Sequence, residues 1–286
     1  MTNAAARSSA GAADAPGNEL GEFLRARREL VTPEQVGVPV VGVRRVAGLR
    51  REEVAMLAGI SVDYYLRLEQ GRDRNPSAQV LESIARVLQL DADTSAYLLE
   101  LAAPRPRRTA RRRRAETVPP HTLRFVRQLP FPAFVEGRYL DVLAANPLAT
   151  ALSPRLAVGG NRLRDFFLDP AEREMFEPHW EQAATGLVAG FRQSVGTDTD
   201  DPRFVELVGE LSLASPLFGR LWARHDIRQR QGAAMVFQHP QLGELSVDRE
   251  KLAITGTVGM MLVVYHPPSQ ADADKLAVLA SAAAPA

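Results

Sequence analysis

The chain has 286 residues, of which 45% are hydrophobic and 24% charged, and its formal net charge is +1. These values exclude a largely disordered chain and leave enough apolar material for two domains. The absence of cysteine excludes disulfides, thiolate metal sites and cysteine nucleophiles.

The first 18 residues lack the apolar core of a signal peptide. No apolar run in the chain approaches the roughly 18 residues that a membrane-spanning helix needs. We therefore expect a disordered N-terminal tail over residues 1–18 and a cytoplasmic protein without a membrane partner.

Charge is divided unevenly along the chain. Residues 1–115 carry 19 Arg and no Lys against 14 acidic residues, a net charge of +5, whereas the remainder carries 14 Arg and 2 Lys against 20 acidic residues, a net charge of −4. This asymmetry predicts that only the N-terminal half contacts a polyanion.

Residues 19–103 are predicted to form an all-α domain of five short helices. Apolar residues recur there at helical spacing, and glycine, proline and capping residues separate the groups. The apolar residues expected to face the core are Leu20, Phe23 and Leu24; Val54, Leu57 and Ala58; Val80, Ile84, Val87 and Leu88; and Leu98, Leu101 and Ala102.

A tight connection between two helices is predicted near residue 60. Residues 49–60 (LRREEVAMLAGI) form one helix in this prediction, Gly59 turns the chain, and the Ser61 hydroxyl caps the next helix. On that helix Tyr65 and Leu68 lie three residues apart and face inward. The segment GLRREEVAMLAGISVDYYLRLEQGR resembles the helix-turn-helix of the phage-repressor-like (Xre-type) regulators.

This resemblance implies a partner, double-stranded DNA, with the second helix in the major groove. Arg51 corresponds to a phosphate contact, and Arg67 is the best candidate to bind guanine O6 and N7 together. Glu69 corresponds to a buried glutamate of the family, for which we expect a structural ion pair. The DNA-binding residues implied are Arg51, Ser61, Val62, Asp63, Tyr64, Arg67, Arg72, Arg74 and Asn75.

Some of these assignments have alternatives. Tyr64 either meets thymine methyl groups or packs on a neighbouring loop, and Asp63 either faces DNA or caps its own helix. Residues 29–47 form a long insertion between the first two helices, in which Arg44 and Arg45 either approach a phosphate or minor groove or are solvated loop charges.

Residues 104–118 read as a linker between domains. The segment RPRRTARRRR has seven arginines in ten positions, and the prolines at its start stop helix propagation. It either adds salt-dependent affinity for nucleic acid or serves as a solvated tether.

Residues 119–286 are predicted to form an α+β domain. The segment PAFVEGRYLDVLAAN resembles two strands around Gly137, the middle of the domain is helical, and alternation or continuous apolarity marks strands near residues 235–247 and 257–268. An antiparallel sheet flanked by helices follows.

This half resembles the PAS-like ligand-binding domain of MmyB-like transcription regulators. Gly160 stands where the family usually has an arginine, which weakens the inference of a ligand headgroup held at that position. The residues and motifs that carry the resemblance are Asn146 in LAANPLA; NRLRDFF with Asn161, Arg164 and Phe167; Trp180; Phe191 and Arg192; Asp201 and Pro202; Ser215 and Phe218; LWARHDI with Trp222 and His225; and FQHPQLGEL.

The resemblance implies that a small hydrophobic molecule, with fatty acids among the candidates, binds between sheet and helices. Aromatic residues at such spacings are also typical of a plain core, and this alternative stays open for each of them. The residues proposed to line the pocket are Phe134, Tyr139, Phe166, Phe191, Phe218, Trp222 and Met261.

Taken together, these features predict a DNA-binding transcriptional regulator that senses a small ligand and works as a homodimer. The alternative is a helical protein-interaction module whose Arg-rich linker supplies nonspecific affinity for nucleic acid. The histidines are scattered, and no sequence motif for catalysis or nucleotide binding occurs, so we expect no enzyme activity, no metal and no cofactor.

Overall fold

The computed structural model describes residues 18–39, 44, 46–73, 75–103, 116–196, 199, 201–227 and 233–283. Contacts divide the chain between Gln89 and Leu90 into two compact units, which are described separately below. The last helix of the predicted helical domain is grouped with the second unit, and the boundary after residue 103 stays a prediction. Most of the predicted tail and linker lies outside the described residues.

The first unit is helical. It contains α1 (Glu19–Leu30), a 3-10 turn at Glu34–Val36, α2 (Arg51–Ala58), α3 (Val62–Glu69) and α4 (Ala78–Val87). Phe23, Leu24, Val54 and Ile84 are buried as expected, but Leu57 is 39% exposed. The prediction for Leu57 was wrong, because the buried residues of α2 are Val54, Ala55 and Ala58 and Leu57 lies off that face of the helix.

The connection between α2 and α3 has the predicted capping. Gly59 has a φ of 70°, a left-handed conformation that favours glycine. The Ser61 hydroxyl accepts a hydrogen bond from the Tyr64 backbone N–H at 3.1 Å. The helix predicted over residues 49–60 is shorter, because Arg50 is extended and Gly59 ends it.

Helices α1 and α3 approach each other closely at Gly21. A Cβ atom at this position would lie 2.2 Å from the Glu69 carbonyl oxygen, so only glycine fits. The Asn18 side chain donates to the same oxygen at 3.0 Å. The carboxyl end of α3 is therefore held against the amino end of α1.

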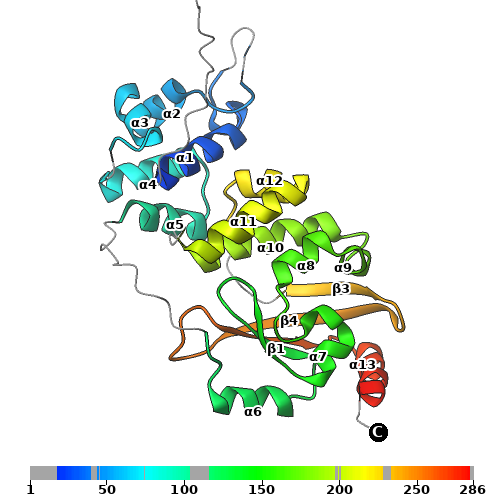
Figure 1. The fold of residues 1–286 in the computed structure, drawn as a ribbon. Helices are drawn as coiled ribbons and strands as arrows, with labels where there is room; N and C mark the ends of the chain where they lie inside the picture. The colour runs from blue at the N-terminus through cyan, green and yellow to red at the C-terminus, as the bar shows by residue number, and fades with distance from the viewer. Residues whose placement is uncertain are drawn as a thin grey trace, which may run out of the picture. The chain divides into compact units, whose positions relative to one another are not determined.

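The second unit is built on a five-stranded antiparallel sheet with the order β2-β1-β5-β4-β3. This confirms the predicted fold class, an all-α N-terminal part and an α+β PAS-like domain (Figure 1). The strands are β1 (Ala133–Glu136), β2 (Val142–Ala145), β3 (Ala233–His239), β4 (Gly243–Ala253) and β5 (Met261–His266). The helices are α5 (Ala92–Ala102), α6 (Pro120–Gln128), α7 (Pro147–Leu152), α8 (Arg162–Leu168), α9 (Pro170–Met175), α10 (Trp180–Val195), α11 (Pro202–Ala214), α12 (Pro216–Ala223) and α13 (Gln270–Ala283).

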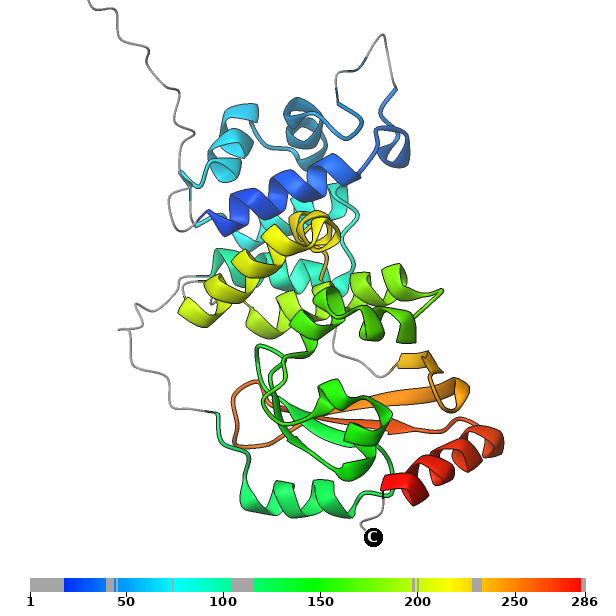
Figure 2. The same ribbon diagram turned by 45° about the vertical axis from the view of Figure 1, so that its right-hand side comes forward.

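The two faces of this sheet are covered by different helices. Figures 1 and 2 show α6 on one side and α8, α9 and α10 on the other. Because side chains alternate along a strand, Val135 packs with α6 while Phe134 packs under the other helices. We call the face that carries Phe134 the inner face.

Two asparagines noted in the sequence hold the loops beside the sheet. The Asn146 side-chain oxygen accepts from the backbone N–H groups of Ala133, at 3.1 Å, and Ala149, at 2.9 Å. Asn161 caps α8 by accepting from Arg164 N–H at 2.9 Å, and its amide donates to the Tyr139 carbonyl at 2.8 Å. Both are buried, so these family landmarks have a structural role here.

Candidate DNA-binding helix and ligand cavity

Helix α3 has one buried and one exposed face. Tyr65 and Leu68 are fully buried, whereas Val62 is 45% exposed and Asp63 is exposed beside it. Ser61 already caps the helix, so the structure assigns the cap to Ser61 and not to Asp63. The exposed face presents the amino half of α3 to solvent.

Arg67 and Tyr64 lie together on this exposed face. The Arg67 guanidinium carbon is 5.5 Å from the centre of the Tyr64 ring, a cation–π arrangement. Burial and the nearby charge of Asp73 raise the pKa of Tyr64. Tyr64 is half-buried, so its ring contacts the Arg67 side chain and is still partly exposed to solvent.

The chain turns immediately after α3. The Arg67 carbonyl accepts from the backbone N–H of Arg72 at 2.9 Å, and Gly71 has a φ of 65°. Arg72 and Asn75 are exposed beyond this turn. Arg74, which was also predicted to contact the DNA backbone, lies outside the described residues.

Glu69 forms a buried ion-pair network, as expected. Its carboxylate is fully buried and accepts from Arg28 Nε and Arg51 Nε, each at 2.6 Å. Arg28 also donates to the Leu49 carbonyl at 2.8 Å. Burial lowers the pKa of Arg28, but the hydrogen bond with Glu69 and its charge raise it, and the net pKa is raised. Arg51 remains 42% exposed while bound to Glu69.

Arg44 from the insertion has a role that neither sequence interpretation included. Its guanidinium binds both oxygens of Glu53, at 2.7 and 2.8 Å, and donates to the Gly48 carbonyl at 2.9 Å. Glu53 also accepts from the Arg50 backbone N–H at 2.6 Å, which completes a cap at the start of α2. Arg44 is therefore a structural clamp between the insertion and α2, and its neighbour Arg45 lies outside the described residues.

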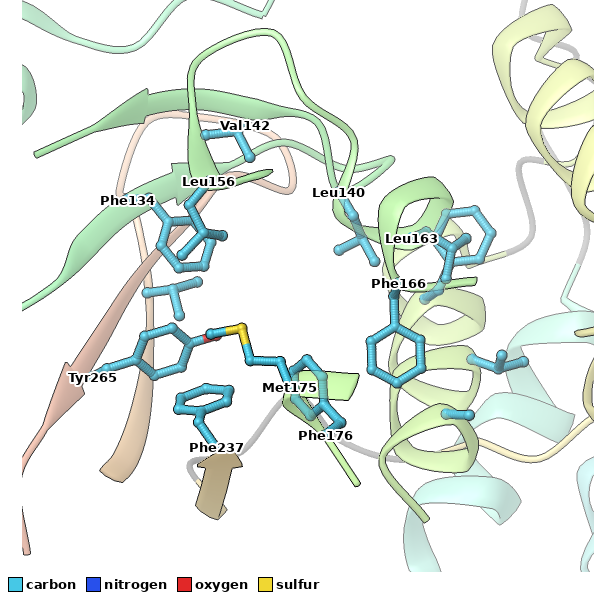
Figure 3. Packing of buried hydrophobic residues seen from close by; sticks show 14 of the residues in the cluster. Phe134, Leu140, Val142, Leu156, Leu163, Phe166, Met175, Phe176, Phe237 and Tyr265 are labelled. Carbon is cyan, nitrogen blue, oxygen red and sulfur yellow. The ribbon is translucent and has the colours of Figure 1, made fainter. Parts of the chain in front are cut away.

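A small cavity of about 30 Å³ lies in the second unit between the sheet and α8 and α9. Figure 3 shows the Met175 side chain extending toward the rings of Tyr265 and Phe237. The apolar lining consists of Leu152, Leu156, Phe166, Met175, Phe176, Phe237 and Tyr265, and the polar lining of Ser153, Arg155, Arg162, Asp165 and Glu172.

The predicted ligand residues are spread beyond this cavity. Phe166 lines it, and Phe134 is buried in the surrounding cluster. Trp222 stacks on Phe218, with ring centres 5.8 Å apart, and lies 5.8 Å from Phe191. Tyr139 is buried and Met261 half-buried. The ligand role of all seven residues stays a prediction.

Sequence reasoning missed the charged lining residues Arg162 and Glu172. Both belong to short helices, where a charged residue normally faces solvent. The alternation in β5, in which Tyr265 is two residues from the buried Val263, was a usable signal for Tyr265.

Family models match both parts of the chain. Residues 118–279 match the family model of the MmyB-like transcription regulator ligand binding domain, which is more than half of the chain. The chain belongs to the MmyB-like transcription regulators. Residues 19–98 match a helix-turn-helix domain. A search of curated proteins found no match.

The two matched regions of this MmyB-like regulator coincide with the two candidate sites. The helix-turn-helix match contains α2, α3 and the turn after them, and the ligand-binding match contains the sheet and the cavity. This MmyB-like regulator is a helix-turn-helix DNA-binding transcription regulator with a ligand-binding domain. Among the residues described, no helix is long and apolar enough to cross a membrane, and no three His, Asp or Glu side chains gather as metal ligands.

Replacing Arg44 by Ala is expected to lower the free energy of unfolding of the MmyB-like regulator, because Glu53 loses its charged donors. Arg44 lowers the pKa of Glu53 to about 2 from an ordinary 4.5. A lowered carboxyl pKa stabilises the fold above the unfolded pKa, and this stability is lost as the pH falls from about 4.5 toward 2.

Urea unfolding at pH 7 and at several pH values below 5 measures this effect. The variant should lose less stability on acidification than the wild type. Arg25→Ala, an exposed position on α1, is the matched control. Equal stability of Arg44→Ala and the control would contradict the clamp.

Proposed function

We propose that this regulator binds specific DNA sequences through α3, acts as a cytoplasmic homodimer, senses a small hydrophobic ligand, with fatty acids among the candidates, and has no catalytic activity. The observation that carries the DNA-binding part is the division of α3. Tyr65 and Leu68 anchor the helix, and Val62, Asp63 and Arg67 face solvent. A helix exposed on one side fits the major groove.

Arg67 is the proposed base-reading residue. Its guanidinium lies over the Tyr64 ring. This contact restricts the Arg67 side chain before DNA is bound, so the side chain loses less conformational entropy on binding. Arg51 is the proposed phosphate contact, because its side chain is anchored through Nε by Glu69 and yet partly exposed. Two copies of α3 in a homodimer would reach half-sites about 34 Å apart.

The size of the cavity bears on the ligand. Ligand pockets usually measure roughly 300–1,000 Å³, whereas this cavity is about 30 Å³. A hydrophobic ligand must therefore displace side chains, and Met175 is the most adaptable of the apolar lining residues. The ligand therefore competes with the side chains that fill the cavity in its absence. It changes the affinity for DNA only as far as it binds one conformation of the protein more tightly than another.

The proposal of no catalytic activity rests on the structural role of His239 and on the two matched families. The ring nitrogen Nδ1 of His239 accepts from the backbone N–H groups of Gln241 and Leu242, which is a turn contact between β3 and β4. Both matched family models describe binding domains.

The test is a selection from random duplex DNA at about 150 mM salt. Nonspecific binding is weak at this salt concentration, with dissociation constants of roughly 10⁻⁴–10⁻⁶ M. We expect one enriched motif. Arg67→Ala should weaken binding to that motif by about 1–3 kcal/mol and change binding to random DNA little.

Arg86→Ala, an exposed arginine on α4, serves as the control and should keep the full preference. If Arg67→Ala weakened binding to all DNA sequences equally, Arg67 would contribute only its charge and would not read bases. Failure to enrich any motif would favour a helical protein-interaction module instead.

A further inference from the structure

Strand β3 (Ala233–His239) lies at one edge of the five-stranded sheet and pairs with β4 (Figure 1). Within the part of the chain that the structure describes, the backbone of β3 has no hydrogen-bond partner apart from β4. Every second residue of an edge strand turns its N–H and C=O groups away from the neighbouring strand. β3 therefore offers a row of unpaired backbone groups along its free edge.

The other edge of the sheet, at β2, is short and partly covered. β2 has only four residues, and Val142 at its start is hydrogen-bonded to a loop. The Val142 N–H donates to the Gly160 carbonyl at 2.8 Å, and the Val142 carbonyl accepts from the Gly159 N–H at 2.9 Å. β3 is thus the long open edge of the sheet. Because each copy of the chain has one such edge, pairing through β3 would stop at two copies.

β3 lacks the features that normally protect an edge strand from pairing. Natural edge strands carry charged side chains, proline or a bulge. β3 contains no aspartate, glutamate, lysine, arginine or proline, and its register with β4 runs without a shift. The charged residues lie instead on the interior strand β4, and they are Glu244, Asp248, Arg249, Glu250 and Lys251. This distribution is the reverse of the one expected for an edge that stays in contact with solvent.

We propose that β3 pairs with β3 of a second copy of the chain and joins two five-stranded sheets into one. A two-fold axis perpendicular to the sheet makes the two strands antiparallel, the direction of every pair in this sheet. With all seven residues paired, Val236 lies directly opposite Val236 of the partner subunit. No like charges face each other across this pair. Met235 and Val236, which are half-buried in one copy, become more deeply buried.

This inference rests on the proposed homodimer and assigns its contact surface to β3. That surface lies next to the cavity of the same domain, because Phe237 on β3 lines it. The Phe237 ring packs edge-on against Phe176, with ring centres 5.2 Å apart, and against Tyr265, at 5.6 Å. A ligand that displaces these rings would act directly on the strand that joins the two copies.

Disulfide cross-linking of the full-length protein tests the pairing, because the chain has no cysteine of its own. Opposite residues of an antiparallel pair have Cα atoms about 4.5–5.5 Å apart, within reach of a disulfide. Val236→Cys should therefore give a cross-linked dimer on mild oxidation. Ala234→Cys is the matched control, because Ala234 is exposed on the same face of β3. In the proposed pairing its two copies lie about 13 Å apart, which is too far for a disulfide.

Sedimentation equilibrium over a range of concentrations measures the strength of the interface. Val236→Lys places two positive charges opposite each other and should weaken dimerisation about tenfold or more. Val236→Glu should have the same effect, and a mixture of the two variants should restore dimers, because unlike charges then meet. Leu213→Lys, at a position that is 91% exposed on α11, is the control and should dimerise like the wild type. Circular dichroism checks that each variant folds.

A wild type that stays monomeric would overturn the proposed homodimer and this interface together, and would leave the β3 edge for a segment of another protein. A wild-type dimer that resists Val236→Lys and gives no cross-link in Val236→Cys would overturn the interface and keep the homodimer. Cross-linking of Ala234→Cys as fast as that of Val236→Cys would indicate random collision and count against the proposed pairing.

Discussion

Glu69→Gln is expected to lower the free energy of unfolding of the N-terminal unit by about 3–5 kcal/mol. The carboxylate is fully buried, and it pairs with Arg28 and Arg51. An amide keeps the shape but not the charge, so the buried Arg28 guanidinium loses its close counter-ion and keeps only the exposed Glu29, at 3.9 Å. This is the costly way to break a buried ion pair.

Chemical unfolding followed by far-ultraviolet circular dichroism measures this loss. Glu52→Gln is the matched control, because Glu52 is exposed on α2 and pairs only loosely with Arg50, at 3.9 Å. The control should change stability by less than about 0.5 kcal/mol. A Glu69→Gln protein as stable as the control would mean that solvent reaches the network.

The same substitution also bears on DNA binding. Arg51 loses its anchor on Glu69, so its side chain gains freedom that DNA binding must remove. Affinity for a selected motif should therefore fall at temperatures where the variant is still folded.

Phe218→Ala is expected to lower the free energy of unfolding by about 3–5 kcal/mol, because it removes a fully buried aromatic side chain and leaves a cavity. The Phe218 ring packs edge-on against Phe167, with ring centres 5.3 Å apart, and stacks on Trp222. Its position in this aromatic cluster makes packing the dominant contribution.

Thermal unfolding should show a large downward shift for Phe218→Ala. Leu213→Ala on α11, where Leu213 is 91% exposed, is the control and should unfold close to the wild type. Titration with decanol below the unfolding temperature then separates the roles. Unchanged stability together with lost ligand binding would make Phe218 a pocket residue and not a core residue.

Local sequence patterns predicted the parts of this regulator that depend on neighbours in the chain. Gly59 and Ser61 end one helix and begin the next through contacts within a few residues, so the helix-turn-helix was recognisable. The alternation of Phe134 and Val135 between the two sheet faces also follows from strand geometry. The helix predicted over residues 49–60 was too long at both ends, and the burial of Leu57 was predicted wrongly, because the buried face of α2 depends on which helices pack against it.

Periodicity and capping act over a few residues, so two helices joined by a tight turn and a following α+β domain could be predicted from the chain alone. The partners of several charged side chains are visible only in the folded protein. Arg44 joins Glu53 in the first unit, and in the second Glu136 meets Lys251, 115 positions away. A charged residue shows no periodic signal for the partner that it finds in the folded chain, since that pairing depends on how strands and helices bring distant segments together.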